Sequence, residues 1–207
     1  MQTTPLYMPK DHMDDLYNSD NFLVRYVHLN RLKNIVKTMP NQDNLNILDA
    51  GCGEGHLLQM LEKKNQHNNY YGIDLTSEAL ARARERCPKM NFIQADLSKI
   101  EIENNFFDFI VCTETLEHVD AYQDVINEFK RILKPGGQLV ITFPNEFWWT
   151  VSRFLLGRRP IRVPDHINFF SPKKIKSYVN LSVEKSLGLP FSWPFWLSLG
   201  QLIKFKK

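Results

Sequence analysis

Short apolar runs alternate with amphipathic segments along most of this chain. The runs have the length of buried strands, and the segments between them repeat apolar residues at three- and four-residue steps, as helices do. Strands that alternate with helices in this way predict an α/β fold, with a mostly parallel sheet and helices on both faces. The strands are expected within residues 46–49, 70–74, 91–96, 106–112 and 138–145, and the helices at 22–39, around 57–61, at 77–87 and at 122–133.

The first forty residues differ in pattern from the rest. A polar stretch that predicts an arm or a short helix precedes an amphipathic helix at 22–39, which Pro40 ends. We therefore divide the chain into an N-terminal helical arm at residues 1–40 and a main domain at residues 41–207. The helix is expected to cover the sheet, and the alternative is a lid over a ligand that would use Tyr17 or Arg25.

A glycine-rich turn follows the first predicted strand. Asp49 ends the apolar run, and Gly51, Gly53 and Gly55 alternate before the next helix begins. Glycine reaches positive φ at little cost and lets a ligand lie against the backbone, and the helix N-terminus adds free N–H groups. The turn therefore predicts a nucleotide-type cradle. A dinucleotide fingerprint would need glycine where His56 stands, which disfavours a nicotinamide cofactor.

Two further acids stand at the ends of the next two predicted strands. Asp74 follows Gly55 by 19 residues, the spacing at which a carboxylate binds the two hydroxyls of a ribose. The alternative for Asp74 is to cap the helix at 77–87. Asp96 repeats the pattern of a strand followed by an acid, and its alternative is an ordinary surface turn. The carboxyl ends of parallel strands share one edge, so all these acids are expected to lie together.

In order and spacing, these motifs resemble the class I S-adenosylmethionine-dependent methyltransferases over roughly residues 45–145, including Leu133–Gly137 before the fifth strand. The resemblance is to the type 11 group and to ubiquinone-pathway O-methyltransferases. It implies that the glycine loop holds the methionine part of the cofactor, that Asp74 binds the ribose and that Asp96 binds the adenine. The cofactor residues expected on this basis are Asp49, Gly51, Cys52, Gly53, Gly55, Asp74, Leu75, Ala95, Asp96, Leu97 and Thr113.

The resemblance also implies a larger sheet than the five strands predicted from periodicity. Two more strands, expected at 181–187 and 199–206, would complete a seven-stranded, doubly wound Rossmann-like sheet whose last strand is antiparallel.

His118 and Glu117 are the catalytic candidates. They follow the fourth strand, at the edge where a methyl acceptor would lie, and a histidine is suited to proton removal near neutral pH. The alternative is a histidine at a helix start that only packs against the cofactor loop.

A divalent metal is an alternative use of the same segment. If the turn is helical, Glu114, Glu117 and His118 share one face, and His166 could complete a mixed nitrogen and oxygen site. This arrangement is similar to that of small-RNA 2′-O-methyltransferases, so metal-assisted RNA methylation is an alternative function. Acids in a first helical turn also favour the helix dipole without any metal, and we prefer that interpretation.

Net charge and cysteine spacing indicate which partners and which cellular compartment to expect. The net charge of +3 over 207 residues is too small to indicate nucleic acid by itself. Cys52, Cys87 and Cys112 form no disulfide or zinc pattern, which favours a reducing, cytoplasmic location. No apolar leader or membrane-span pattern is found.

An aromatic and then basic insertion occupies residues 146–170, and residues 191–197 are again aromatic. Together they predict either an apolar acceptor pocket or a surface that contacts membrane lipid. The alternative without a binding role is a helix packed over the sheet. The arginines would bind an anionic group of the acceptor; they are Arg153, Arg158, Arg159 and Arg162. We expect transfer to an oxygen of a small or lipid-like acceptor, with a non-catalytic cofactor-binding subunit as the alternative from another class.

Overall fold

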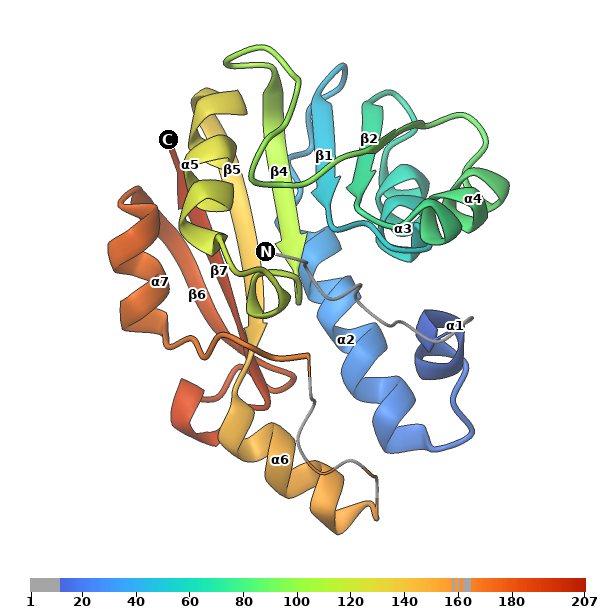
Figure 1. Cartoon of the computed structure of the whole chain (residues 1–207), viewed down its shortest axis with the longest axis vertical. Coiled ribbons are helices and arrows are strands. Elements are labelled where there is room, and N and C mark those ends of the chain that lie inside the picture. Colours follow the sequence, from blue (N-terminus) through green and yellow to red (C-terminus); the bar gives the residue numbers. More distant parts are fainter. Residues whose placement is uncertain (1–11, 158, 160, 162–164) are drawn as a thin grey trace.

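A seven-stranded sheet forms the centre of the computed structural model, which describes residues 12–157, 159, 161 and 165–207 (Figure 1). The strand order is β3-β2-β1-β4-β5-β7-β6. The first eleven residues of the predicted arm, together with Arg158 and Arg162, lie outside the described residues. The strands are β1 (Asn46–Ala50), β2 (Asn69–Asp74), β3 (Asn91–Gln94), β4 (Phe107–Thr113), β5 (Leu133–Pro144), β6 (Ser182–Leu189) and β7 (Gly200–Lys206).

The first five strands pair in parallel, and β7 runs antiparallel to both β5 and β6. This confirms the predicted fold class, including the two late strands. The carboxyl ends of the parallel strands therefore meet at one edge, where the chain leaves β1, β2 and β4 for the predicted site segments.

Helices cover both faces of the sheet. Leu32 and Ile35 of α2 and Leu58 of α3 are fully buried with β1 on one face, while Phe129 of α5 and Ile175 of α7 are fully buried on the other. The helices are α1 (His12–Tyr17), α2 (Phe22–Thr38), α3 (His56–Lys64), α4 (Ser77–Arg86), α5 (Tyr122–Ile132), α6 (Glu146–Leu155) and α7 (Pro172–Val179), with short 3₁₀ turns at Leu116–His118 and Phe195–Leu197.

The fifth strand begins earlier than its pattern predicts. Leu133 already pairs with Phe107, and the ladder resumes where Gln138 pairs with Phe109. The intervening residues bulge out of the ladder, and Gly136 has a φ of +78° there. Pro135, Gly136 and Gly137, which the sequence pattern places before the fifth strand, therefore form a bulge inside β5.

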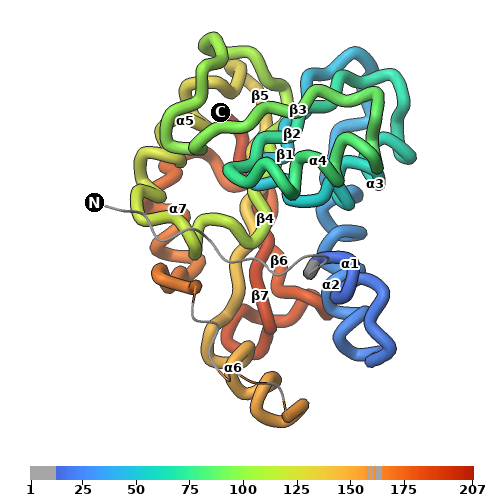
Figure 2. Tube along the Cα trace, turned by 45° about the vertical axis from the view of Figure 1, so that its right-hand side comes forward, coloured from blue at the N-terminus to red at the C-terminus, as the bar shows by residue number. Residues whose placement is uncertain are grey.

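Beyond the carboxyl edge of the sheet lie α1, the N-terminal half of α2, and α6 (Figures 1 and 2). Among the described residues, no helix has the length and apolarity needed to cross a bilayer.

Candidate functional site

The glycine loop between β1 and α3 is shaped by positive φ angles. Gly51, Gly53 and Gly55 have φ values of +78°, +50° and +80°. A Cβ on Gly51 would lie 2.4 Å from the Oγ1 atom of Thr115, whereas a Cβ on Gly53 would meet nothing within 4 Å. The loop therefore leaves open space at its middle glycine, which is where a ligand can approach the backbone.

Asp74 is bonded to this loop across the sheet edge. Its Oδ2 accepts a hydrogen bond of 2.8 Å from the backbone N–H of Gly53, and its Oδ1 accepts from the N–H and the hydroxyl of Thr76. Thr76, not Asp74, occupies the N-cap position of α4. Asp74 is therefore placed beside the glycine loop, as a ribose-binding carboxylate would be.

Asp49 lies beneath the loop at the end of β1 and is buried. Its Oδ1 has no hydrogen-bond partner. Burial, with a smaller contribution from the charge of Asp74, raises the pKa of Asp49 to about 8. A buried carboxyl group with an unpartnered oxygen, two residues before the first glycine of the loop, fits a ligand that carries a positive charge, such as the ammonium group of S-adenosylmethionine.

Cys52, the other loop residue expected to bind the cofactor, points its side chain into the core. Its side chain is buried in the core that lies under the loop, and a Cβ on Gly72 would come within 2.8 Å of its sulfur. Cys52 can therefore serve a ligand only through its backbone. Thr113, at the end of β4, is half-buried and shares a hydrogen bond of 2.7 Å with the hydroxyl of Thr142.

The residues expected around the adenine lie at the ends of β2 and β3. Leu75 is 60% exposed, and Leu97 is buried. Asp96 is exposed, and its Oδ1 accepts two hydrogen bonds of 2.8 Å from Ser98. Ala95 donates its N–H to the carbonyl of Asp74. An exposed leucine at this edge fits a planar apolar ligand, and the adenine-binding roles of these residues remain predictions.

Arg31 of α2 is a candidate site residue that sequence reasoning missed. It is buried, and its Nη1 forms an ion pair of 3.2 Å with Oε2 of Glu114, while its Nε has no partner. Burial lowers the pKa of the guanidinium, but nearby Glu114 and the Tyr17 hydroxyl more than offset this and the pKa is raised. A buried cation with a free donor fits the carboxylate of the cofactor's methionine part. The signal was a stripe in α2, where His28 and Arg31 interrupt the buried apolar positions.

Glu114 lies elsewhere than expected, and the prediction that it shares a helical face with Glu117 and His118 is wrong. The 3₁₀ turn begins only at Leu116, and Glu114 has a φ of +50°. Its carboxylate points to Arg31 and accepts a hydrogen bond from Thr142. The buried arginine thus holds Glu114 away from the histidines.

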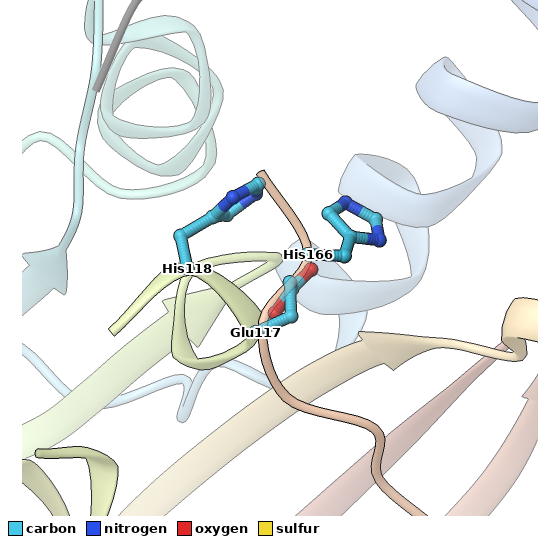
Figure 3. A group of neighbouring side chains, drawn as sticks. All are labelled: Glu117, His118 and His166. Atoms are coloured by element: carbon cyan, nitrogen blue, oxygen red, sulfur yellow. The ribbon is translucent and has the colours of Figure 1, made fainter. Parts of the chain in front are cut away.

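Glu117, His118 and His166 do come together (Figure 3). One potential ligand atom from each lies within 4.8 Å of the others, and the two imidazole rings are 4.8 Å apart between centroids. The chain after α6 is held here because the carbonyl of Glu117 accepts hydrogen bonds from the backbone N–H groups of Ile167 and Asn168. The sequence offered His166 only as a possible fourth member of a metal site, and the backbone bonds supply the cause of its position beside Glu117 and His118.

Hydrogen bonds orient both imidazoles. Nδ1 of His118 lies 3.0 Å from the carbonyl oxygen of Asp165, and Nδ1 of His166 lies 2.6 Å from Oε1 of Glu146. A carbonyl only accepts, so His118 carries its proton on Nδ1; an ionised Glu146 assigns the same tautomer to His166. In the neutral form, each ring therefore keeps the Nε2 lone pair for another partner.

Burial also sets the charge of this cluster. Burial, reinforced by nearby Glu114, raises the pKa of Glu117 well above its usual range, and neither carboxyl oxygen has a hydrogen-bond partner. Burial, reinforced by His166, lowers the pKa of His118. A neutral imidazole beside a carboxyl group can accept a proton from a substrate hydroxyl. The same donor set fits a divalent cation, with Glu146 and Asp165 in the supporting positions that orient histidine ligands.

A second group of potential metal ligands consists of Asp14, Glu54 and His56, of which Glu54 belongs to the glycine loop. Cations already accompany it, because Arg86 lies 3.0 Å from Asp14 and Arg82 lies 3.4 Å from Glu54. This group fixes α1 to the loop.

Comparisons with known proteins agree with this geometry. Residues 48–141 match the family described as Methyltransferase domain. Two curated relatives are ubiquinone biosynthesis O-methyltransferases. The protein of Rickettsia typhi is 28% identical over 161 residues, which are 72% of this chain and 64% of that protein. That of Rickettsia bellii is 27% identical over 180 residues, 80% of this chain and 74% of that protein.

Solved structures share the whole fold at low sequence identity. A protein from Pyrococcus horikoshii superposes with a TM-score of 0.74 at 17% identity and covers 97% of this chain and 99% of its own. A methyltransferase from Thermotoga maritima that depends on S-adenosylmethionine gives 0.71 at 18% identity, covering 95% and 99%.

Proposed function

We propose that the chain is an S-adenosylmethionine-dependent methyltransferase that moves the methyl group to an oxygen of a small, lipid-like acceptor. The cofactor is S-adenosylmethionine, which supplies an activated methyl carbon. The names of the curated relatives support oxygen as the acceptor atom and a lipid-like molecule as the acceptor.

The protein's part is to hold the two reactants in line and to exclude water. In this proposal, Asp49 and Arg31 bind the charged groups of the methionine part, and the glycine loop lies against it. Asp74 binds the ribose and Asp96 the adenine. A buried carboxyl group then lies next to the ammonium and a buried guanidinium next to the carboxylate, so the unpartnered Oδ1 of Asp49 and the unpartnered Nε of Arg31 each meet a group of opposite charge.

The carrying observation for oxygen chemistry is the oriented His118 ring. Its Nδ1 is committed to the carbonyl of Asp165, so its Nε2 is the atom that takes the proton from an acceptor hydroxyl. Glu117 lies beside the ring with no competing partner, and the imidazolium that forms favours ionisation of its carboxyl group, which then stabilises that cation. His166 and Glu146 close this side of the site.

The test is methyl transfer from radiolabelled S-adenosylmethionine to phenols with alkyl tails of increasing length. We expect labelled ether products, with tailed phenols favoured over untailed ones. His118→Ala should abolish most of this activity and leave cofactor binding intact. Cofactor binding without transfer to any acceptor would instead support a non-catalytic binding subunit.

A metal-assisted reaction is the second candidate, and the buried, unpartnered Glu117 beside two imidazoles favours it. Glu117, His118 and His166 would hold the ion, which would lower the pKa of the acceptor hydroxyl. A titration with chelator and then Mn²⁺ distinguishes the two routes, because only the metal-assisted route loses and regains activity. A small RNA offered as acceptor in the same assay tests the 2′-O-methylation alternative, against which the small net charge argues.

A further inference from the structure

Large apolar side chains are exposed at one end of the molecule. Among the described residues, every exposed large apolar side chain except Leu75, Ile93 and Val183 lies in three segments. These segments are the start of α2, residues 147–169 and residues 191–197. Scattered exposed apolar residues are ordinary, whereas a gathered group indicates an interaction surface.

The start of α2 and residues 191–197 form one aromatic row. The ring of Tyr26 lies between those of Phe22 and Phe191, with centroid distances of 6.0 and 5.8 Å, and Phe191 contacts Trp193 at 4.9 Å. The row therefore joins segments from the two ends of the chain.

Helix α6 continues this surface. The indole N–H of Trp148 donates a hydrogen bond to the carbonyl of Trp196, which connects α6 to residues 191–197. No residue of α6 is buried, and Phe147, Phe154 and Leu155 are 67%, 66% and 76% exposed. In both views α6 projects beyond the carboxyl edge of the sheet (Figures 1 and 2). We call the start of α2, α6 and residues 191–197 the apolar end.

The charged residues in and after α6 indicate which kind of partner the apolar end binds. Helix α6 carries Arg153, and the sequence that follows it, from 156 to 162, adds three more arginines, while Glu146 is the single carboxylate between 146 and 162. Aromatic and aliphatic side chains combined with arginines are typical of segments that insert into the interface of a bilayer and attract anionic headgroups. We infer that the apolar end docks on the surface of an anionic lipid bilayer.

Docking there would bring the bilayer next to the catalytic cluster. Glu146, the first residue of α6, holds His166, and the side chain of Asn145 donates a hydrogen bond to the carbonyl of Phe195. The same short segment therefore supports both the docking surface and the cluster. If the proposed function holds, the lipid-like acceptor reaches His118 from the bilayer, not from bulk water.

The test is flotation of the full chain with vesicles of phosphatidylcholine, with and without phosphatidylglycerol. We expect binding to the vesicles that contain phosphatidylglycerol, weakened by salt. The double variant Phe154→Ser, Leu155→Ser should lower the partition constant about tenfold or more, because two exposed apolar side chains no longer insert. Val183→Ser, an exposed apolar residue of β6, is the matched control and should bind like the wild type.

Two results would overturn the inference: no binding of the wild type to any vesicle, or equal binding by the wild type and the double variant. If the wild type is also a dimer and the double variant a monomer while neither binds vesicles, the apolar end is an interface between two copies of the chain instead. The same preparations are titrated with S-adenosylmethionine and assayed with a soluble, short-tailed phenol. The double variant should match the wild type in both. Vesicle binding without methyl transfer to any acceptor would contradict the proposed function alone and leave the docking surface standing.

Discussion

The guanidinium of Arg31 lies 3.2 Å from the carboxylate of Glu114, and this ion pair joins α2 to the loop after β4. Both side chains are largely buried, so neither charge is well hydrated. Through this contact α2, which also covers the sheet, reaches the loop that leads to Glu117 and His118. The ion pair also explains why Glu114 is separated from Glu117 and the histidines.

Replacing Arg31 with Met should weaken cofactor binding. A buried hydrogen bond to a charged group contributes about 1.5–3 kcal/mol, so the dissociation constant for S-adenosylmethionine should rise about 10- to 100-fold by calorimetric titration. Lys33→Met is the matched control, because Lys33 is exposed on the same helix. Unchanged affinity in a folded Arg31→Met protein would remove Arg31 from the site.

Gly51 and Gly53 should respond differently to alanine. Both have positive φ, which costs a residue with a Cβ about 1–2 kcal/mol, but only Gly51 also faces Thr115 at 2.4 Å. Overpacking adds about 1–3 kcal/mol, so Gly51→Ala should lower the free energy of unfolding more than Gly53→Ala does. Urea unfolding of the two ligand-free variants measures this difference. Equal losses would mean that Thr115 moves aside freely.

The buried Asp49 should make cofactor binding release a proton. Its pKa is about 8 in the ligand-free protein, so at pH 7 it is mostly protonated, and a neighbouring ammonium group would ionise it. Calorimetry at pH 7 in buffers of different ionisation enthalpy should show close to one proton released. Asp49→Asn should show none from this source and should bind more weakly.

The same carboxyl group predicts how stability depends on pH. The pKa of Asp49 is higher in the folded chain than the ordinary value of 3.8, so the folded state binds the proton more tightly. Its contribution to the stability of the ligand-free protein should therefore fall as pH rises from 3.8 to about 8, and change little above that. Thermal unfolding across this range should show a smaller decline in Asp49→Asn.

His118→Ala should lower kcat about 10²- to 10⁴-fold, because it removes the proton acceptor, while the dissociation constant for the cofactor stays the same. His67→Ala is the control, because His67 is an exposed histidine in the loop between α3 and β2, and this variant should be fully active. If His118→Ala retains wild-type kcat, the acceptor needs no base at this position, which would favour a more acidic acceptor atom such as a thiol.

Much of this protein could be predicted from local sequence pattern. The apolar runs ending in Asp49, Asp74 and Asp96, and the alternating glycines, indicate parallel strands with a nucleotide cradle at their carboxyl edge. These features depend on short-range rules: strand and helix periodicity, positive φ at glycine, and the shared edge of parallel strands.

Only the tertiary structure decided how side chains from distant segments meet. The helical spacing of Glu114, Glu117 and His118 was misleading, because Arg31, which lies on a helix far away in sequence, holds Glu114. The orientation of His118 likewise depends on Asp165, which backbone bonds to Glu117 bring near. Burial and long-range ion pairs are properties of the packed chain, so periodicity determined where the acids of the strands lie, and packing determined which charges each site residue faces.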